Sequence, residues 1–371
     1  MAITVPEKAG GLRIATFNCS LFRENEGQLL GELANRENSQ IKNVAEIIQR
    51  ANPDVILLNE FDYVEGGQAV ERFMRNYLEV GQNGAAPVMF DYYFIAESNT
   101  GILSGVDLNN DGNVQIPGDA FGFGIYPGQY GMALLSKFPI DSTNVRTFQK
   151  FLWKDMPANA MPTDYYSVAA QAIFRLSSKS HWDVPVDVNG MTVHMLCSHP
   201  TPPVFDDGNA ADGAVDWNGR RNHDEIRFWA DYVTPGQGDY IYDDNGSTGG
   251  LASERRFVIL GDQNADPHDG DSYENAIHQM LSNAMIDSTF VPESLGAVDF
   301  GVDFDDTTSW GMRADYTLPS AYGVAVEQGE VFWPTHTDEL FRLVENDDAS
   351  SDHRLVWLDL TFVVESFEKK M

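Results

Sequence analysis

The distribution of hydrophobic residues predicts a chain of alternating strands and helices. Ile41, Val44, Ile47 and Ile48 recur at the spacing of one helix face. Similar spacing predicts three helices, over residues 39–50, 71–78 and 222–232. Short apolar runs predict strands over residues 12–18, 54–60, 132–135, 166–176, 191–197, 256–260, 315–318 and 355–362.

Long polar segments separate these elements and predict loop insertions near residues 81–130, 202–222 and 234–253. Neither an internal repeat nor a break in composition divides the sequence, so we expect one domain over residues 1–371. Strands with long connecting loops favour a layered α/β sandwich, with a functional site on loops at one end of the sheets.

Composition allows a complete hydrophobic core, since 43% of the 371 residues are hydrophobic. No apolar run approaches the roughly 20 residues of a membrane-spanning helix, so we expect no stable membrane association. Residues Met1 to Gly10 lack the apolar core of a signal peptide. We nevertheless expect a secreted or periplasmic protein whose signal peptide lies outside this sequence.

The net charge is strongly negative, because 56 acidic residues face only 24 lysines and arginines, which gives −32. One interpretation is a salt-adapted secreted protein that its acidic surface keeps soluble. The other is functional: such a surface repels polyanions, which makes long duplex DNA a poor substrate.

Two cysteines, Cys19 and Cys197, are too few for a disulfide framework or a zinc site. We expect two buried thiols. A single bridge between neighbouring core strands is the alternative.

Several predicted strands end in a carboxylate, an amide or an imidazole. These residues are Asn18, Glu60, His199, Asp262, Asn264, Asp315, Asp352 and His353. Phosphoester hydrolysis needs oxygen ligands for a hard cation, a base for water, and donors that hold the phosphoryl oxygens. The strand ends supply each of these groups, so they predict a metal-dependent phosphoesterase.

Seven short motifs occur in a fixed order along residues 12–362. They are Thr16-Phe17-Asn18, Leu58-Asn59-Glu60, the segment Gly131 to Ser136, Ser198-His199, Gly261-Asp262-Gln263-Asn264, Ala314-Asp315-Tyr316 and Ser351-Asp352-His353. With these motifs the chain resembles the endonuclease/exonuclease/phosphatase superfamily. The resemblance implies a four-layer αββα sandwich, in which two packed mixed β-sheets are flanked by helices.

The resemblance also implies a divalent-metal site at one end of the sheets. Glu60 corresponds to the principal metal carboxylate, and Asp352 to a second or outer-shell contact. Asn18 corresponds to the amide that holds both the metal site and a phosphate oxygen. The expected ion is Mg²⁺, with Mn²⁺ or Ca²⁺ as alternatives.

The remaining family residues imply in-line attack by water without a covalent intermediate. Asp262 corresponds to the residue that orients or deprotonates water, and Asn264 to a donor for the developing phosphorane. His353 corresponds to a phosphoryl-oxygen contact whose tautomer Asp315 fixes. His199 corresponds to a phosphate-contacting histidine, although the prolines that follow it differ from the common family form.

The sequence departs from the family where a basic or aromatic substrate contact is common, just before the strand predicted at 167–174. Asp164-Tyr165-Tyr166 stands there and contains no arginine. Two clusters of rare positive charge could replace it, and their candidate substrate-binding residues are Lys179, His181, Arg221 and Asn222. The alternative interpretation is a solvated loop followed by an ordinary helix start.

A second metal-like motif begins at Asp107. Asp107, Asn109, Asp111 and Asn113 stand at positions one, three, five and seven of an EF-hand-type loop, with Gly112 at position six. Position twelve, where an EF-hand has Glu, is Gly118, and the acidic residue Asp119 comes one place later. We therefore expect an irregular structural Ca²⁺ loop. The alternative is a polar Asn-Gly turn.

Three catalytic functions fit these residues. The first is a phosphatase or phosphodiesterase acting on small soluble phosphate esters, which the acidic surface favours. The second is a nuclease, which would normally place Lys and Arg along a groove. The third is a sphingomyelinase-like lipid phosphodiesterase, for which Gly122 to Tyr126 is the one mildly apolar loop. A non-catalytic binding module would be expected to lack Glu60, Asp262 or His353, and the sequence holds all three.

Overall fold

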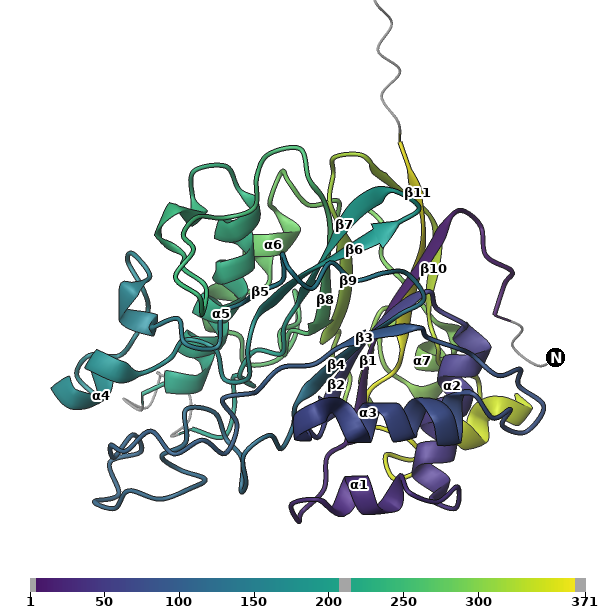
Figure 1. Ribbon diagram of the computed structural model, residues 1–371, viewed down its shortest axis with the longest axis horizontal. Helices are drawn as coiled ribbons and strands as arrows, with labels where there is room; N and C mark the ends of the chain where they lie inside the picture. Colours follow the sequence, from purple (N-terminus) through teal and green to yellow (C-terminus); the bar gives the residue numbers. More distant parts are fainter. Residues whose placement is uncertain (1–4, 207–214, 364–371) are drawn as a thin grey trace, which may run out of the picture.

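Two β-sheets pack face to face in the computed structural model, which describes residues 5–206 and 215–363 (Figure 1). Helices cover the outer face of each sheet, so the order of layers is helix, sheet, sheet, helix. This arrangement confirms the predicted four-layer sandwich. No helix in these described ranges is long and apolar enough to cross a membrane.

The first sheet has six strands in the order β10-β11-β1-β2-β4-β3. Their bounds are β1 Leu12–Leu21, β2 Val55–Phe61, β3 Tyr92–Phe94, β4 Met132–Ser136, β10 Val324–Val331 and β11 Val356–Phe362. Only β1 and β2 pair in parallel, with Asn18 opposite Asn59. Because parallel strands end at the same edge, β1 and β2 deliver their last residues to one place.

The second sheet has five strands in the order β5-β6-β7-β8-β9. Their bounds are β5 Arg146–Thr147, β6 Trp182–Val188, β7 Met191–Cys197, β8 Arg256–Asp262 and β9 Asp315–Pro319. The parallel pair here is β7 and β8, while β8 and β9 are antiparallel with Asp262 opposite Asp315. The register therefore places two predicted catalytic carboxylates side by side.

Alternation along the strands divides the hydrophobic core between the layers. On β1, Ile14 packs between the two sheets, whereas Ala15 and Phe17 face the helices. Helices cover the outer faces of both sheets (Figure 1): α1 Gln28–Glu32, α2 Ser39–Ala51 and α3 Gln68–Phe73 on the first sheet, and α5 Trp217–Val233 and α6 His278–Leu281 on the second. The remaining helices are α4 Val168–Ile173 and α7 Leu295–Phe300. Short helical turns span Glu65–Gly67, Met74–Leu78, Trp153–Asp155, Gly238–Tyr240, Tyr273–Asn275 and Glu339–Leu343.

The strand predicted over 166–176 is wrong, because α4 occupies its centre. The Ser167 hydroxyl accepts the N–H of Ala170 and caps this helix, so a side-chain bond at the amino end favours the helix over an extended strand. The predicted insertion at 202–222 is also too long. α5 begins at Trp217, where the Asp216 carboxylate caps it, and residues 207–214 lie outside the described residues.

Both cysteines are free and buried, which confirms two buried thiols and excludes the bridge. The Cys19 thiol donates to the carbonyl of Asn59 at 3.3 Å, and the Cys197 thiol to that of Met195 at 3.7 Å. Burial raises the pKa of both thiols, so neither is a reactive thiolate at neutral pH.

Candidate active site

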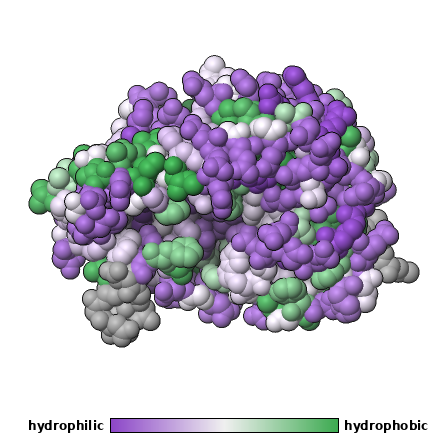
Figure 2. Space-filling view, turned by 90° about the horizontal axis from the view of Figure 1, so that it is seen from below, coloured by the Kyte–Doolittle hydropathy of each residue, from purple (hydrophilic) through white to green (hydrophobic). Residues whose placement is uncertain are grey.

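The carboxyl ends of β1, β2 and β8 meet at the lower end of the molecule in Figure 1, where α1 follows β1. Figure 2 shows this lower face as largely hydrophilic, with hydrophobic side chains gathered toward one side. Asn18 comes from β1, Glu60 from β2 and Asp262 from β8. The structure thus brings together residues that stand more than 200 positions apart in the sequence.

The backbone of the site is strained at Glu60 and at Asn264, which follows Asp262 by two residues. Glu60 has φ +57° and Asn264 has φ +51°, in the left-handed region that side chains other than glycine rarely adopt. Each residue costs about 1 kcal/mol there. At Asn264 the turn is held by its own N–H, which donates to Asp262 Oδ1 at 2.8 Å. Such strain concentrates where a side chain must be presented in one direction.

Asp262 is the centre of the site and is almost completely buried. Its Oδ2 accepts from Asn18 Nδ2 at 3.1 Å, and His199 Nε2 lies 3.2 Å from the same oxygen. His353 Nε2 lies 3.6 Å away. Burial acts to raise the pKa of Asp262, but His353 and His199 outweigh it and hold that pKa well below its usual range. Asp262 is therefore an ionised carboxylate at neutral pH.

The two histidines beside Asp262 have opposite charge states. His353 Nδ1 lies 2.8 Å from Asp315 Oδ2, and burial is outweighed by Asp315 and Asp262, which raise the pKa of His353 to about 10. Burial and the nearby ammonium of Lys179 lower the pKa of His199 to about 4. At pH 7 the site therefore combines a cationic imidazole with a neutral one.

Glu60 and Asp352 form the part of the site that fits a metal. Burial raises the pKa of Glu60 to about 7, and the neighbouring charge of Asp352 adds to this. Asp352 Oδ1 accepts from the Ser20 hydroxyl at 2.9 Å. Two carboxylates in mutual repulsion, with the Asn18 amide beside them, form a hard-oxygen donor set whose charge a divalent cation would balance.

Asp262, Asp315 and His353 also have ligand atoms within 4.8 Å of one another. The protonation of His353 makes this group a poor metal site. His353 holds protons on both ring nitrogens at neutral pH, because its pKa is raised to about 10. Metal ligation requires a neutral imidazole nitrogen, so the cation fits Glu60 and Asp352 better than it fits this group.

Lys179 lies beside the catalytic residues. Its side chain is only 7% exposed, and it makes no hydrogen bond or ion pair with any residue that the structure describes. Its charge acts on Glu60, Asp262 and His199, and burial lowers its own pKa. Lys179 stands three residues before β6, a strand that the hydrophobic pattern did not predict.

The structure does not bring the other three predicted substrate-binding residues into this group. His181 is bonded at Nδ1 to the Ser177 hydroxyl and at Nε2 to the Glu225 carbonyl. Arg221 donates to the carbonyls of Leu176, Phe121 and Arg175. Asn222 donates to Thr201 and to Gln263, which lies between Asp262 and Asn264. These side chains tie α5 to the loops around the site.

Three residues of the site were not singled out by the sequence patterns. Asn59 accepts the N–H of Asp262 and donates to the carbonyl of Ser198, so it joins the two sheets. Burial and the charge of Glu60 raise the pKa of Tyr130 to about 12. Trp310 stands edge-on to His353, with ring centroids 5.0 Å apart. Of these three residues, only Asn59 could have been found from the sequence, because it belongs to the Leu58-Asn59-Glu60 motif.

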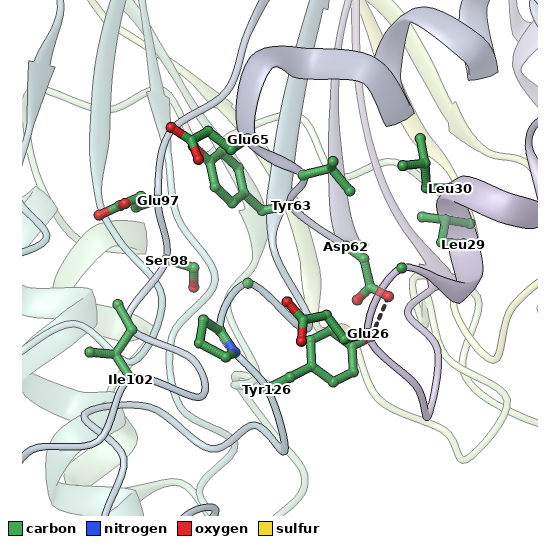
Figure 3. Close-up of a pocket in the computed structure, with 14 residues that line it drawn as sticks. Glu26, Leu29, Leu30, Asp62, Tyr63, Glu65, Glu97, Ser98, Ile102 and Tyr126 are labelled. Carbon is green, nitrogen blue, oxygen red and sulfur yellow. Dashed lines mark hydrogen bonds between the residues drawn. The ribbon is translucent and has the colours of Figure 1, made fainter.

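A cavity of about 310 Å³ opens next to the segment that follows Glu60 (Figure 3). Glu26, Asp62, Glu65 and Glu97 contribute carboxylates to its wall, and the Tyr126 hydroxyl donates to Asp62 at 2.6 Å. Leucine, isoleucine, valine and tyrosine side chains make up most of the remaining lining, which contains no lysine or arginine. Such a cavity suits a neutral or cationic organic group and repels a phosphate.

Comparison with known proteins agrees with this geometry. Residues 15–353 match the model of the Endonuclease/Exonuclease/phosphatase family. An endonuclease/exonuclease/phosphatase from Beutenbergia cavernae DSM 12333 is 17% identical, with a TM-score of 0.50 over 95% of this chain and 71% of that chain. The human Nocturnin catalytic domain with bound sulfate is 14% identical, with a TM-score of 0.48 over 96% of each chain. No curated protein matches this sequence.

Proposed function

Because the chain belongs to the endonuclease/exonuclease/phosphatase family of metal-dependent phosphoesterases, we propose that it hydrolyses small soluble phosphate esters by direct attack of water. The observation that carries this proposal is the charge pattern around Asp262. An ionised carboxylate stands between a neutral histidine and a cationic one, with a buried lysine nearby. Water activation and phosphate binding need these opposite properties within one small space.

Asp262 accepts a hydrogen bond from the attacking water and orients its lone pair toward phosphorus. A pKa well below the usual range makes Asp262 a weak base, so its contribution is orientation more than proton removal. A cation held by Glu60, Asp352 and the Asn18 amide would neutralise phosphate oxygens and make bound water more acidic. Asn18 donates its amide N–H to Asp262, and its Oδ1 accepts the N–H of Ser20 at 3.3 Å, which leaves one lone pair of that oxygen for the cation.

Three donors hold the phosphoryl oxygens as negative charge develops. His353 supplies an imidazolium N–H, and Asp315 fixes the ring that carries it. Lys179 supplies a side-chain nitrogen that makes no hydrogen bond or ion pair with any described residue, close to the charges of Glu60 and Asp262. Asn264 bonds the Pro200 carbonyl with its side-chain amide and has a second N–H for substrate. Donors of this kind stabilise the transition state more than the ground state.

The preference for small esters follows from charge. Net charge is −32, and the cavity beside Glu60 has acidic walls. Neither feature supplies the row of cations that a nucleic-acid backbone requires. Two aromatic rings lie near these residues, Tyr130 near Glu60 and Trp310 against His353. We therefore propose an ester whose organic group is neutral or cationic, hydrolysed outside the cytoplasm without stable membrane association.

A substrate panel tests this proposal. Purified protein is assayed with p-nitrophenyl phosphate, its bis ester, phytate, sphingomyelin and plasmid DNA, each with Mg²⁺, Mn²⁺, Ca²⁺ or EDTA. Metal-dependent turnover of the small esters is expected. Plasmid cutting without small-ester turnover would overturn it in favour of a nuclease, and turnover of sphingomyelin alone in favour of a lipid phosphodiesterase.

A matched pair of variants tests the site itself. Asp262→Asn should lower kcat by about 100-fold or more with an unchanged circular dichroism spectrum. Asp287→Asn removes a carboxylate that accepts only turn hydrogen bonds from Thr289, and should keep full activity. Activity that survives EDTA or the Asp262 substitution would refute the catalytic assignment.

A further inference from the structure

Residues 99–122 form an irregular hairpin that the catalytic chemistry does not explain. Isolated bridges join Thr100 to Gly122 and Leu103 to Ala120 across it. The tip carries the irregular EF-hand-type sequence that begins at Asp107. Asp119 closes this tip, because its two carboxylate oxygens accept the N–H groups of Leu108 at 2.6 Å and Gln115 at 2.8 Å.

The first half of the tip folds around its own polar side chains. Asp107 Oδ2 accepts the N–H of Gly112 at 2.9 Å, so the residues at positions one and six of the motif are in contact. Gly112 has φ +86°, which is the conformation that favours glycine at this point. Asn109 Oδ1 accepts the N–H of Asp111, and Asp111 Oδ1 accepts that of Asn113. The carboxylates and the amide therefore lie within one turn.

The remaining oxygen of Asp107 points to a ligand. Asp107 Oδ1 is buried and has no hydrogen-bond partner. The carboxylate lies inside the loop, since its other oxygen bonds Gly112. A buried carboxylate oxygen without a donor is unfavourable unless a positive charge compensates it.

The chain itself supplies no such charge. Asp107, Asp111 and Asp119 form no ion pair within the described ranges 5–206 and 215–363. The sequence has no lysine or arginine between Arg75 and Lys137. A cation from solution would supply the missing positive charge.

We propose that this tip is a structural Ca²⁺ site, separate from the catalytic metal. Asp107, Asn109 and Asp111 would supply side-chain oxygens, and Asn113 its backbone carbonyl. Asp119 closes the loop by accepting the N–H groups of Leu108 and Gln115, and so holds the other residues of the motif in place. A mixed set of carboxylate, amide and carbonyl oxygens on a flexible loop suits Ca²⁺ better than Mg²⁺, which requires near-ideal octahedral geometry.

Calcium at the tip would also support the active site, a consequence that rests on the proposed function. At the base of the hairpin, the N–H of Asn99 donates to the carbonyl of Lys179 at 2.9 Å. The carbonyl of Phe121, on the returning segment, accepts from Arg221 at 2.6 Å. The hairpin therefore holds the backbone of Lys179, and ordering its tip would fix that wall of the site.

Terbium luminescence tests the site directly, because Tb³⁺ replaces Ca²⁺ and is excited through nearby aromatic rings. The Tyr165 hydroxyl donates to the carbonyl of Asn109 at 3.3 Å, and Tyr165 stacks on Trp217 with centroids 4.6 Å apart. In the full chain with excess Mg²⁺, we expect saturable Tb³⁺ emission that Ca²⁺ displaces. Ca²⁺ should also raise Tm by a few degrees over the EGTA-treated protein.

The Asp107→Asn, Asp111→Asn double variant should lose both effects. Asp141→Asn is the matched control, because its carboxylate also accepts turn bonds, from Thr143 and Asn144, but lacks the motif spacing. Asn109→Asp adds a carboxylate and should tighten Ca²⁺ binding several-fold, which keeps the test valid if the double variant does not fold. The proposal would be overturned if Ca²⁺ changed neither the Tb³⁺ emission nor the Tm of the native chain. It would also be overturned if Asn109→Asp left the affinity for Ca²⁺ unchanged. Neither the Tb³⁺ emission nor the Tm depends on hydrolysis, so the Ca²⁺ proposal can be correct even if the proposed function is wrong.

Discussion

His353 Nδ1 lies 2.8 Å from Oδ2 of Asp315, and this contact makes His353 a permanent cation in the neutral pH range. Asp315 is itself held by the Thr307 hydroxyl at 2.8 Å. The arrangement fixes both the direction and the charge of the His353 ring. In the proposed mechanism, Asp315 therefore acts on the reaction through His353.

Replacing Asp315 by Asn should move the alkaline limit of activity. Native His353 keeps its proton until about pH 10, whereas loss of the Asp315 charge lowers that pKa. The variant should therefore lose kcat/KM at lower pH than the native enzyme, and fall by about 10–100-fold at neutral pH. A pH–rate profile measures both effects. An alkaline limit at the native position would contradict the assigned role.

Metal affinity should depend on the protonation of Glu60. Its pKa is raised to about 7, so below that pH a proton competes with the cation. Mn²⁺ binding, followed by electron paramagnetic resonance, should weaken about ten-fold for each pH unit below 7. Glu60→Gln should bind weakly at every pH. Equal affinity at pH 5.5 and pH 8 in the native protein would exclude Glu60 as a ligand.

The same shift has a stability consequence in metal-free protein. Because the folded pKa of Glu60 exceeds its ordinary value of 4.5, folding favours the protonated form. The stabilisation of the folded state by protonated Glu60 is complete below about pH 4.5 and is lost as pH rises through about 7. A bound cation should restore stability in that upper range, which thermal melts with EDTA and with Mg²⁺ would detect.

Fold stability should depend strongly on the buried pair of Arg13 and Asp359. The guanidinium contacts the carboxylate twice, at 2.6 and 2.8 Å, and neither side chain exceeds 2% exposure. Asp359→Asn should lower the free energy of unfolding in urea by about 3–5 kcal/mol, because it leaves a buried charge unpaired. Arg75→Ala, which removes an exposed pair with Glu71, should cost about 0.5 kcal/mol or less. Equal losses would refute this prediction.

Trp310 should contribute to substrate preference. It is 50% exposed although it contacts His353, so it presents an apolar surface beside the phosphate position. Trp310→Ala should raise KM for an aryl phosphate about ten-fold and leave an alkyl phosphate less affected, while Trp310→Phe retains most binding. Tyr92→Ala removes an exposed ring from the edge strand β3 and should change neither. A uniform loss for both esters would argue for a structural role.

The core of the site was predictable because it depends on strand ends. Apolar runs ending in Asn18, Glu60 and Asp262 mark where sheets deliver polar groups, and the structure places these three at one edge. The charge states were not predictable in this way. They arise from electrostatic interactions such as that of Lys179 with His199. The hydrophobic pattern of the sequence does not show which segments come together in this way.

Local bonds explain the errors in secondary structure. β6 was missed because Trp182–Val188 contains acids and Pro185, which usually exclude a strand. Pro185 is tolerated because β5, on that side, has only two paired residues, so its missing N–H breaks no ladder bond. At 166–176 the Ser167 cap favours helix α4 over the predicted strand.

The pairing of β1 with both β2 and β11 has a consequence for how the protein is made. Asn18 lies on the first strand, while His353 precedes the last, and the two strands are neighbours in one sheet. His353 is synthesised after Asn18, Glu60 and Asp262, so the site cannot assemble before both of its halves have left the ribosome. Folding of this sheet and assembly of the site are therefore coupled, because both require the pairing of β1 with β11.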